Sequence, residues 1–225
     1  MYVARRGTVM GPTKLFVAAA VLSVVAVAQS PITADSPFQV RYASNLTTGD
    51  SVINITNTGA NGDNLFGPGT GGSVGNICVN VYAFSPDEQL ISCCSCLVTP
   101  SGLVSLSVAN DLISNTLTGI RPNSVVVKLI STLAGTGGSD VNCTNSAGLA
   151  RGAVLAAGLA AWGTTIRAGV GGAITMTETP FTPVTLSDGE LASISSRCAF
   201  NIGNASPFGI CRSCRSGGLG AANGR

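Results

Sequence analysis

The eight cysteines of this 225-residue chain constrain its fold more than any other feature. They are Cys78, Cys93, Cys94, Cys96, Cys143, Cys198, Cys211 and Cys214. An even number of cysteines in an exported protein predicts a disulfide framework, because thiols oxidise outside the cytosol. We therefore expect all eight to be bonded in pairs, although sequence alone leaves about a hundred pairings open.

Residues 1–28 are typical of a removable export signal. Arg5, Arg6 and Lys14 precede an apolar run that ends in small residues just before Gln29. The run is shorter than the roughly 20 residues that a membrane-spanning helix needs. We expect cleavage before Gln29 and a secreted protein, extracellular or at the cell surface, with no membrane anchor after cleavage.

The low charge of the chain excludes several classes of partner. Charged residues make up 10% of it, against about 25% in an average soluble domain. Loss of the export signal leaves no basic cluster large enough to neutralise phosphates, so nucleic acid is not an expected partner. A surface built from Gly, Ser, Thr and Asn has few charges to keep copies apart, which favours self-association.

Short runs of alternating or β-branched residues, separated by turn residues, predict a chain made mainly of strands. The predicted strands cover residues 38–43, 51–57, 77–84, 89–98, 103–108, 124–133, 162–166 and 174–179. A capping box, in which Ser187 caps an amide and Glu190 reaches back, predicts one late helix that ends near Gly203. We expect residues 38–225 to form a single domain that is mainly all-β: an antiparallel β-sandwich, immunoglobulin-like in architecture, with one C-terminal α-helix and disulfide cross-links.

The predicted hairpin over residues 77–98 limits where its cysteines can bond. A symmetric turn places Cys78 opposite Ser95, one residue from both Cys94 and Cys96. A small register shift or a bulge would bring Cys78 into bonding distance of either one. A cross-strand disulfide from Cys78 to Cys94 or Cys96 is therefore a pairing that the hairpin allows, and the sequence does not choose it over the others.

Neighbouring cysteines of one strand serve different partners. Cys93 and Cys94 must point to opposite faces, because side chains alternate along a strand. The C-terminal segment with Cys211 and Cys214 has little apolar content to hold it in place. We expect it to be tied covalently, either to Cys198 or to the cysteines at 93–96.

A metal or redox site is the alternative interpretation of these cysteines. Cys93 and Cys96 form one CxxC and Cys211 and Cys214 form another, the ligand number and spacing of a four-cysteine zinc or iron–sulfur site. Either CxxC could also be redox-active. An oxidising compartment favours disulfides over both alternatives.

The chain lacks the side chains of the common catalytic sites. It contains no histidine, which excludes Ser-His-Asp and Cys-His catalysis and any His-ligated metal site. Asp87 and Glu88 fit a solvated turn and Glu190 a helix cap, so a carboxylate pair for glycoside hydrolysis is not expected. We expect no enzymatic activity, no cofactor and no small-molecule substrate.

The start of the mature chain predicts a means of assembly. Residues 29–37 form a polar, proline-bounded leader that we expect to be flexible. Phe38, Val40 and Tyr42 follow with the alternation of a half-buried strand. Such a segment could insert into the sheet of a neighbouring copy by strand addition. The alternative is that the strand pairs within its own domain, as most strands do.

Five segments resemble an uncharacterised family of secreted, cysteine-rich bacterial proteins. They are ISCCSC at 91–96, VTPSGLVSLSV, NDLISNTLTG, GLAAWGTT and the terminal GICRSC. The resemblance covers most of the mature chain and implies export from a bacterium, but it implies no catalytic residue.

We expect a non-enzymatic structural protein, a subunit of a filament, pilus-like or cell-surface assembly of identical copies. The alternative is a secreted binding module or adhesin, with the loops at 59–75 and 134–157 as its contact surface. A third possibility is a metal-binding or redox protein that uses the four cysteines of the two CxxC motifs.

Overall fold

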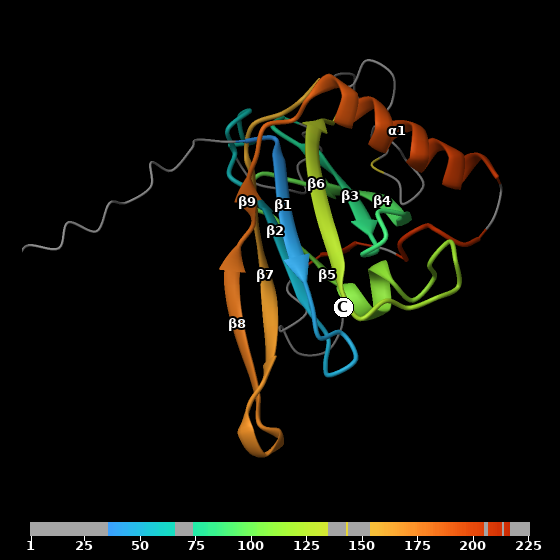
Figure 1. Ribbon diagram of the computed structural model, residues 1–225. Helices are drawn as coiled ribbons and strands as arrows, with labels where there is room; N and C mark the ends of the chain where they lie inside the picture. Colours follow the sequence, from blue (N-terminus) through green and yellow to red (C-terminus); the bar gives the residue numbers. More distant parts are fainter. Residues whose placement is uncertain are drawn as a thin grey trace, which may run out of the picture. The chain divides into compact units, whose positions relative to one another are not determined.

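Two antiparallel sheets of five strands each make up the fold (Figure 1). The structure is a computed structural model that describes residues 36–65, 74–134, 143, 154–204, 207–212 and 214–216. The predicted export signal at 1–28 and residues 29–35 of the leader lie outside the described residues. Residues 66–73 of the loop at 59–75 and most of the loop at 134–157 lie outside them as well.

Sheet A has the strand order β4-β3-β6-β1-β9, and sheet B has the order β10-β5-β2-β7-β8. The strands of sheet A are β4 (Leu90–Val98), β3 (Ile77–Phe84), β6 (Val125–Leu133), β1 (Phe38–Ala43) and β9 (Thr182–Pro183). Those of sheet B are β10 (Arg215–Ser216), β5 (Leu103–Ser107), β2 (Val52–Asn57), β7 (Leu159–Ala168) and β8 (Ile174–Pro180). One α-helix, α1 (Asp188–Gly203), and two short helical turns, η1 (Val108–Leu112) and η2 (Val170–Gly172), complete the described elements. The predicted antiparallel β-sandwich with one C-terminal helix is confirmed.

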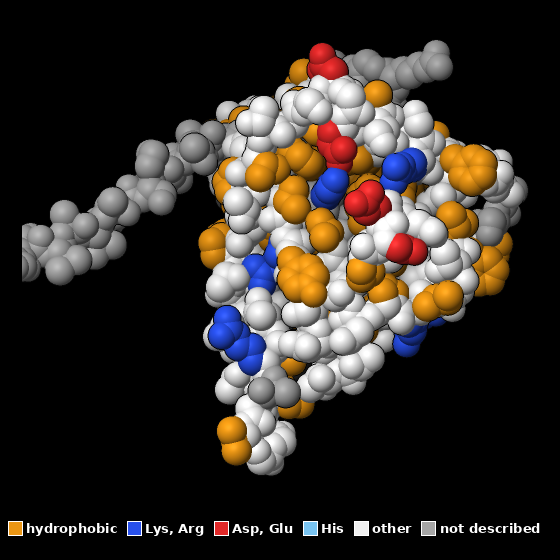
Figure 2. All heavy atoms as spheres, in the orientation of Figure 1, with side chains coloured by type: hydrophobic (Ala, Val, Ile, Leu, Met, Phe, Trp, Pro, Cys, Tyr) orange, Lys and Arg blue, Asp and Glu red, His pale blue; other side chains and the backbone are white. Residues whose placement is uncertain are grey.

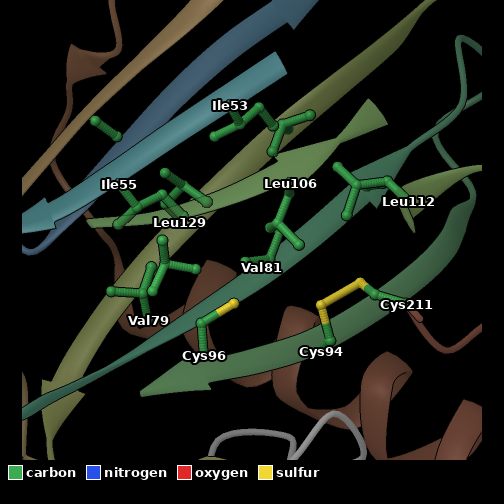
Figure 3. Packing of buried hydrophobic residues seen from close by; sticks show 14 of the residues in the cluster. Ile53, Ile55, Val79, Val81, Cys94, Cys96, Leu106, Leu112, Leu129 and Cys211 are labelled. Atoms are coloured by element: carbon green, nitrogen blue, oxygen red, sulfur yellow. A yellow bond between two sulfur atoms is a disulfide. The ribbon is translucent and has the colours of Figure 1, made fainter. Parts of the chain in front are cut away.

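The main core lies between the two sheets. Alternate residues of β3, such as Val79 and Val81, face Ile53, Ile55 and Leu106 of sheet B (Figure 3). All of these side chains are almost completely buried. Burial of one such side chain contributes roughly 1.5–3 kcal/mol, so this layer supplies most of the hydrophobic stabilisation.

A second core lies on the other face of sheet A, against α1. Tyr82 and Phe84 of β3 and Phe38 of β1 pack there with Ile194 and Cys198 of the helix. Because sheet A is covered on both faces, β3 is buried along its whole length. This explains why its sequence is almost continuously apolar.

The predicted start of α1 is confirmed, and its capping box is only half formed. The Ser187 hydroxyl accepts a hydrogen bond from the Glu190 amide at 3.1 Å. The Glu190 carboxylate does not reach back to the cap and forms an ion pair with Lys128 of β6. Lys128 also lies over the Phe84 ring, so this contact ties the first turn of the helix to the sheet beneath it.

Four disulfides join the eight cysteines: Cys78–Cys143, Cys93–Cys198, Cys94–Cys211 and Cys96–Cys214. The expectation that Cys93 and Cys94 serve different partners is correct. Cys93 bonds to α1, whereas Cys94 and Cys96 bond to the segment 207–216, which we call the C-terminal arm. The disulfides indicate an oxidising environment.

The cross-strand bond from Cys78 to Cys94 or Cys96 that a symmetric hairpin would allow is not formed. An irregularity between Ala83 and Phe84 shifts the register of β3 and β4, so that Cys78 lies opposite Leu97. Cys94 and Cys96 lie opposite residues that face the main core, and Cys78 alternates with those residues along β3. Cys78 therefore points to the other face of sheet A, where it bonds to Cys143.

Two segments cross between the sheets, one at each side of the sandwich. The C-terminal arm pairs with β4 of sheet A at Cys93 and continues into β10, which pairs with β5 of sheet B. On the opposite side, β8 of sheet B continues through the buried residue Phe181 into β9, which pairs with β1 of sheet A. Each side of the sandwich is therefore bridged by backbone.

The disulfides of the C-terminal arm predict a graded loss of stability. Replacement of Cys94 and Cys211 by alanine leaves the arm tied by Cys96–Cys214, and we expect the free energy of unfolding to fall by about 2 kcal/mol in the chain-entropy model. Replacement of Cys94, Cys96, Cys211 and Cys214 together should lower it by about 5 kcal/mol. Cys93–Cys198 is then the nearest remaining cross-link, so the unfolded chain gains the freedom of a longer loop. Denaturant unfolding without reductant measures both values. An equal fall in the free energy of unfolding for the two variants would contradict the pairing of Cys94 with Cys211 and of Cys96 with Cys214.

Candidate functional site

The four outer edges of the two sheets differ in how they are protected. Exposed strand edges tend to pair with other chains, so native proteins keep them short, interrupt them or cover them. In the described residues, the edge strands are β4 and β9 in sheet A and β10 and β8 in sheet B. β4 is covered and β9 and β10 are very short, whereas β8 is long and uncovered, with Glu178 as its one charge and Pro180 as its last residue.

The β4 edge is covered by the C-terminal arm. The Cys93 amide donates to the Gly209 carbonyl at 3.0 Å, and the Cys211 amide donates to the Cys93 carbonyl at 3.2 Å. The β9 edge has only two residues, and one of them is Pro183, which has no amide hydrogen. The β10 strand is equally short.

The β8 edge is long and exposed. All seven residues of β8 are exposed, and Ile174 and Met176 keep 53% and 54% of their surface accessible. Val170, in the turn that joins β7 to β8, is fully exposed. The end of this hairpin projects beyond β1 in Figure 1 and carries no charged side chain on the face in Figure 2. The hairpin therefore presents an apolar end and an uncovered backbone edge.

The hydrogen bonds at the two ends of the hairpin fix which β8 amides point outward. The Gly169 amide donates to the Ala173 carbonyl at 2.7 Å, and the Phe181 amide donates to the Ala161 carbonyl at 2.9 Å. In an antiparallel ladder the bonded pairs alternate, so odd-numbered residues of β8 face β7. The amides of Ile174, Met176 and Glu178 consequently point away from the sheet.

The predicted donor strand lies within its own domain. β1 pairs with β6 over its whole length, from Phe38 to Ala43. Phe38 and Val40 belong to the cluster under α1, whereas Tyr42 is 59% exposed. The alternative pairing that the sequence left open is therefore the one observed for these three residues.

The polar side chains of β1 face sheet B, which the alternation alone did not reveal. The Gln39 amide donates to the Leu159 carbonyl at 2.7 Å. Arg41 crosses the same gap, with 8% of its surface exposed. Its Nη1 donates to the carbonyl and hydroxyl oxygens of Thr179 at 2.7 and 2.6 Å, and its Nη2 donates to the Thr165 hydroxyl at 2.7 Å. Arg41 is thus a polar tie between the two sheets.

A cleft of about 460 Å³ opens beside Arg41, between the edge of sheet A and β8. It is lined by Val40, Arg41, Tyr42, Thr165, Thr179, Pro180, Thr182 and Val184. We call it the β1–β8 cleft. Burial lowers the pKa of the Arg41 guanidinium from its ordinary value, and the negative charge of Glu178 offsets part of this shift. Arginine nevertheless stays protonated in proteins, so the cleft contains a fixed positive charge.

The cysteines of the predicted metal or redox alternative are all bonded in disulfides. Cys93 bonds to Cys198, Cys94 bonds to Cys211, and Cys96 bonds to Cys214. Cys93, Cys96, Cys211 and Cys214 therefore do not form a set of four thiolates. Within the described residues no group of cysteine and acidic side chains is placed to hold a metal ion.

No family model, curated protein or solved structure matches this chain. In the part of the chain that the structure describes, no helix is long and apolar enough to cross a membrane. The β8 edge and the β1–β8 cleft are therefore interpreted from their own geometry.

The close approach of Arg41 to β7 predicts that replacing Gly163 destabilises the fold. A Cβ atom at Gly163 would lie 2.4 Å from Arg41 Nε and 2.7 Å from its Cδ. We expect Gly163→Ala to lower the free energy of unfolding by about 1–3 kcal/mol, since the side chain must leave its site. Gly189→Ala is the matched control, because nothing lies within 4 Å of that position. Denaturant unfolding that gives equal values for the two variants would show that Arg41 is not fixed against β7.

Proposed function

We propose that this protein is a non-enzymatic subunit of an extracellular assembly of identical copies, joined by strand addition at the β8 edge. The observation that carries the proposal is the contrast between β8 and the other sheet edges. A seven-residue edge strand without lysine or bulge is the kind of edge that pairs with another chain.

Two further properties support assembly outside the cell. The disulfides fit a secreted protein, because they form in oxidising compartments and stabilise the folded domain there. The surface carries few charged side chains, which lie among polar and hydrophobic ones in Figure 2. Copies of such a subunit meet little electrostatic repulsion when they pack together.

Two donors could occupy the β8 edge of a neighbouring copy. The leader, residues 29–35, precedes β1 and could join copies head to tail, which propagates into a filament. A second β8 strand in antiparallel orientation would give a symmetric pair instead. Centred on Met176, that pair places Glu178 opposite Ile174, so no like charges meet. β1 itself is a poor donor, because it would have to leave its own sheet.

The outward amide of Met176 gives a sharp test of strand addition. Met176→Pro removes a hydrogen-bond donor from the free edge and leaves the β7 ladder intact, so we expect a folded monomer. Met176→Ala keeps the amide and should still assemble. Electron microscopy and light scattering of the mature proteins measure the difference, which should be at least tenfold in polymer mass.

Matched controls separate folding from assembly and identify the donor. Both variants should retain four disulfides by mass spectrometry without reductant. Loss of polymers on deletion of residues 29–35 would identify the leader as donor, and their persistence would identify a second β8 strand. Wild-type protein that stays monomeric in native and purified material would refute the proposed function.

A further inference from the structure

We propose that the β1–β8 cleft binds a carboxylate group through Arg41, Thr165 and Thr179. This site goes beyond the proposed assembly, because it lies inside the gap between the sheets and uses side chains and not the free edge. It supplies the observation that favours the alternative function of a binding module. Three features of the cleft carry the argument: its charge, its hydrogen-bond donors and its apolar walls.

The charge of Arg41 has no acidic partner in the cleft. The only ion pair within the described residues joins Lys128 and Glu190, on the opposite face of sheet A. The oxygen atoms that Arg41 contacts belong to the carbonyls of Thr179 and Pro180 and to the hydroxyl groups of Thr165 and Thr179, all neutral. The negative charge of Glu178 acts on Arg41 but belongs to none of the groups that the guanidinium contacts, so the buried cation has no opposite charge in direct contact. A bound anion would supply that charge.

Several hydrogen-bond donors around Arg41 have no acceptor among the described residues. The hydroxyl groups of Thr165 and Thr179 accept hydrogen bonds from Arg41, so their own protons are left to donate. Neither hydroxyl donates a hydrogen bond to another group in the described residues. Arg41 Nε, which is buried against Gly163, also has no acceptor among the described residues. Arg41, Thr165 and Thr179 all line the cleft, so one Nη2 hydrogen and two hydroxyl protons are left there for a ligand.

The walls of the cleft define the class of ligand. Val40, Pro180 and Val184 contribute apolar surface, and Tyr42 contributes an exposed ring at the opening. No acidic residue lines the cleft, and the carboxylate of Glu178 accepts a hydrogen bond from Asn54 instead. A planar two-oxygen anion matches one guanidinium and two hydroxyl groups, and a short apolar stem fits the walls. The ligand class is therefore an organic carboxylate.

Titration with butyrate tests the site directly. The Met176→Pro variant is the protein to use, since it should be monomeric and keeps the cleft unchanged. We expect saturable shifts of the Arg41 side-chain NMR signals, with a dissociation constant in roughly the millimolar range for so small a ligand. Butyramide and sodium chloride at matched concentrations are controls for the stem and for ionic strength, and neither should produce the shifts.

Variants of the two threonine positions identify the donors. Thr179→Val keeps the shape of the side chain and removes its hydroxyl proton, so we expect butyrate affinity to fall at least fivefold. Thr177→Val is the matched control, because it faces the same side of β8 and does not line the cleft. It should bind within twofold of the parent protein. Arg41→Lys should bind at least tenfold more weakly, since lysine has no planar guanidinium to contact both threonine hydroxyls and the ligand together.

A negative result for carboxylate binding can be distinguished from a negative result for assembly. Absence of saturable shifts, equal shifts with butyramide, or equal losses in the two threonine variants would overturn the carboxylate site. If Arg41→Lys fails to fold, the threonine pair still decides. Inhibition of wild-type assembly by butyrate would identify the carboxylate of a second copy as the natural ligand. Unchanged assembly, with binding intact, would identify a free organic acid.

Discussion

Strand β4 is held covalently on both of its faces, and the rest of the fold depends on this constraint. One face bonds through Cys93 to α1, and the other bonds through Cys94 and Cys96 to the C-terminal arm. Few side chains of α1 are buried, namely Ile194, Cys198 and Asn201, with Leu191 and Ile202 partly buried, so hydrophobic burial holds the helix only in part. The disulfides replace that missing burial by limiting the freedom of the unfolded chain.

This covalent constraint makes the two sides of the sandwich unlike each other. The β4 side is covered by an arm that two disulfides fix in place. The β8 side is bridged by the continuous β8–β9 strand and by Arg41, and it keeps both an open edge and a cleft. The features that suggest function therefore lie together on the side where polar and backbone contacts take the place of cysteines.

The sequence predicts the strands and the sandwich well, because alternation and turn residues are local properties. Side-chain alternation, which is also local, correctly predicts that Cys93 and Cys94 bond to different partners. The partner of Cys78 could not be predicted, because the shift at Ala83 and Phe84 follows from packing between strands. Cys143 lies in a Gly-rich stretch whose sequence has no periodicity, so nothing in it pointed to that bond.

The candidate site was harder to predict than the fold. Alternation shows that β1 has two faces, but it does not show that Gln39 and Arg41 face the second sheet. The apolar face of Phe38 and Val40 resembles a main-core face, and only the position of α1 explains why it is not. The partners of Arg41 lie more than a hundred residues further along the chain, so its environment exists only in the folded protein.

The continuous strand that passes through Phe181 has a mechanical consequence. β8 is bonded along its length to β7, and β9 is bonded to β1 in the other sheet. A pulling force applied to β8 would reach both layers along the main chain itself, without relying on side-chain contacts between them. The ladder between β8 and β7 holds seven residue pairs and the ladder between β9 and β1 holds two, so the link to sheet A is the one that would break first under such a force.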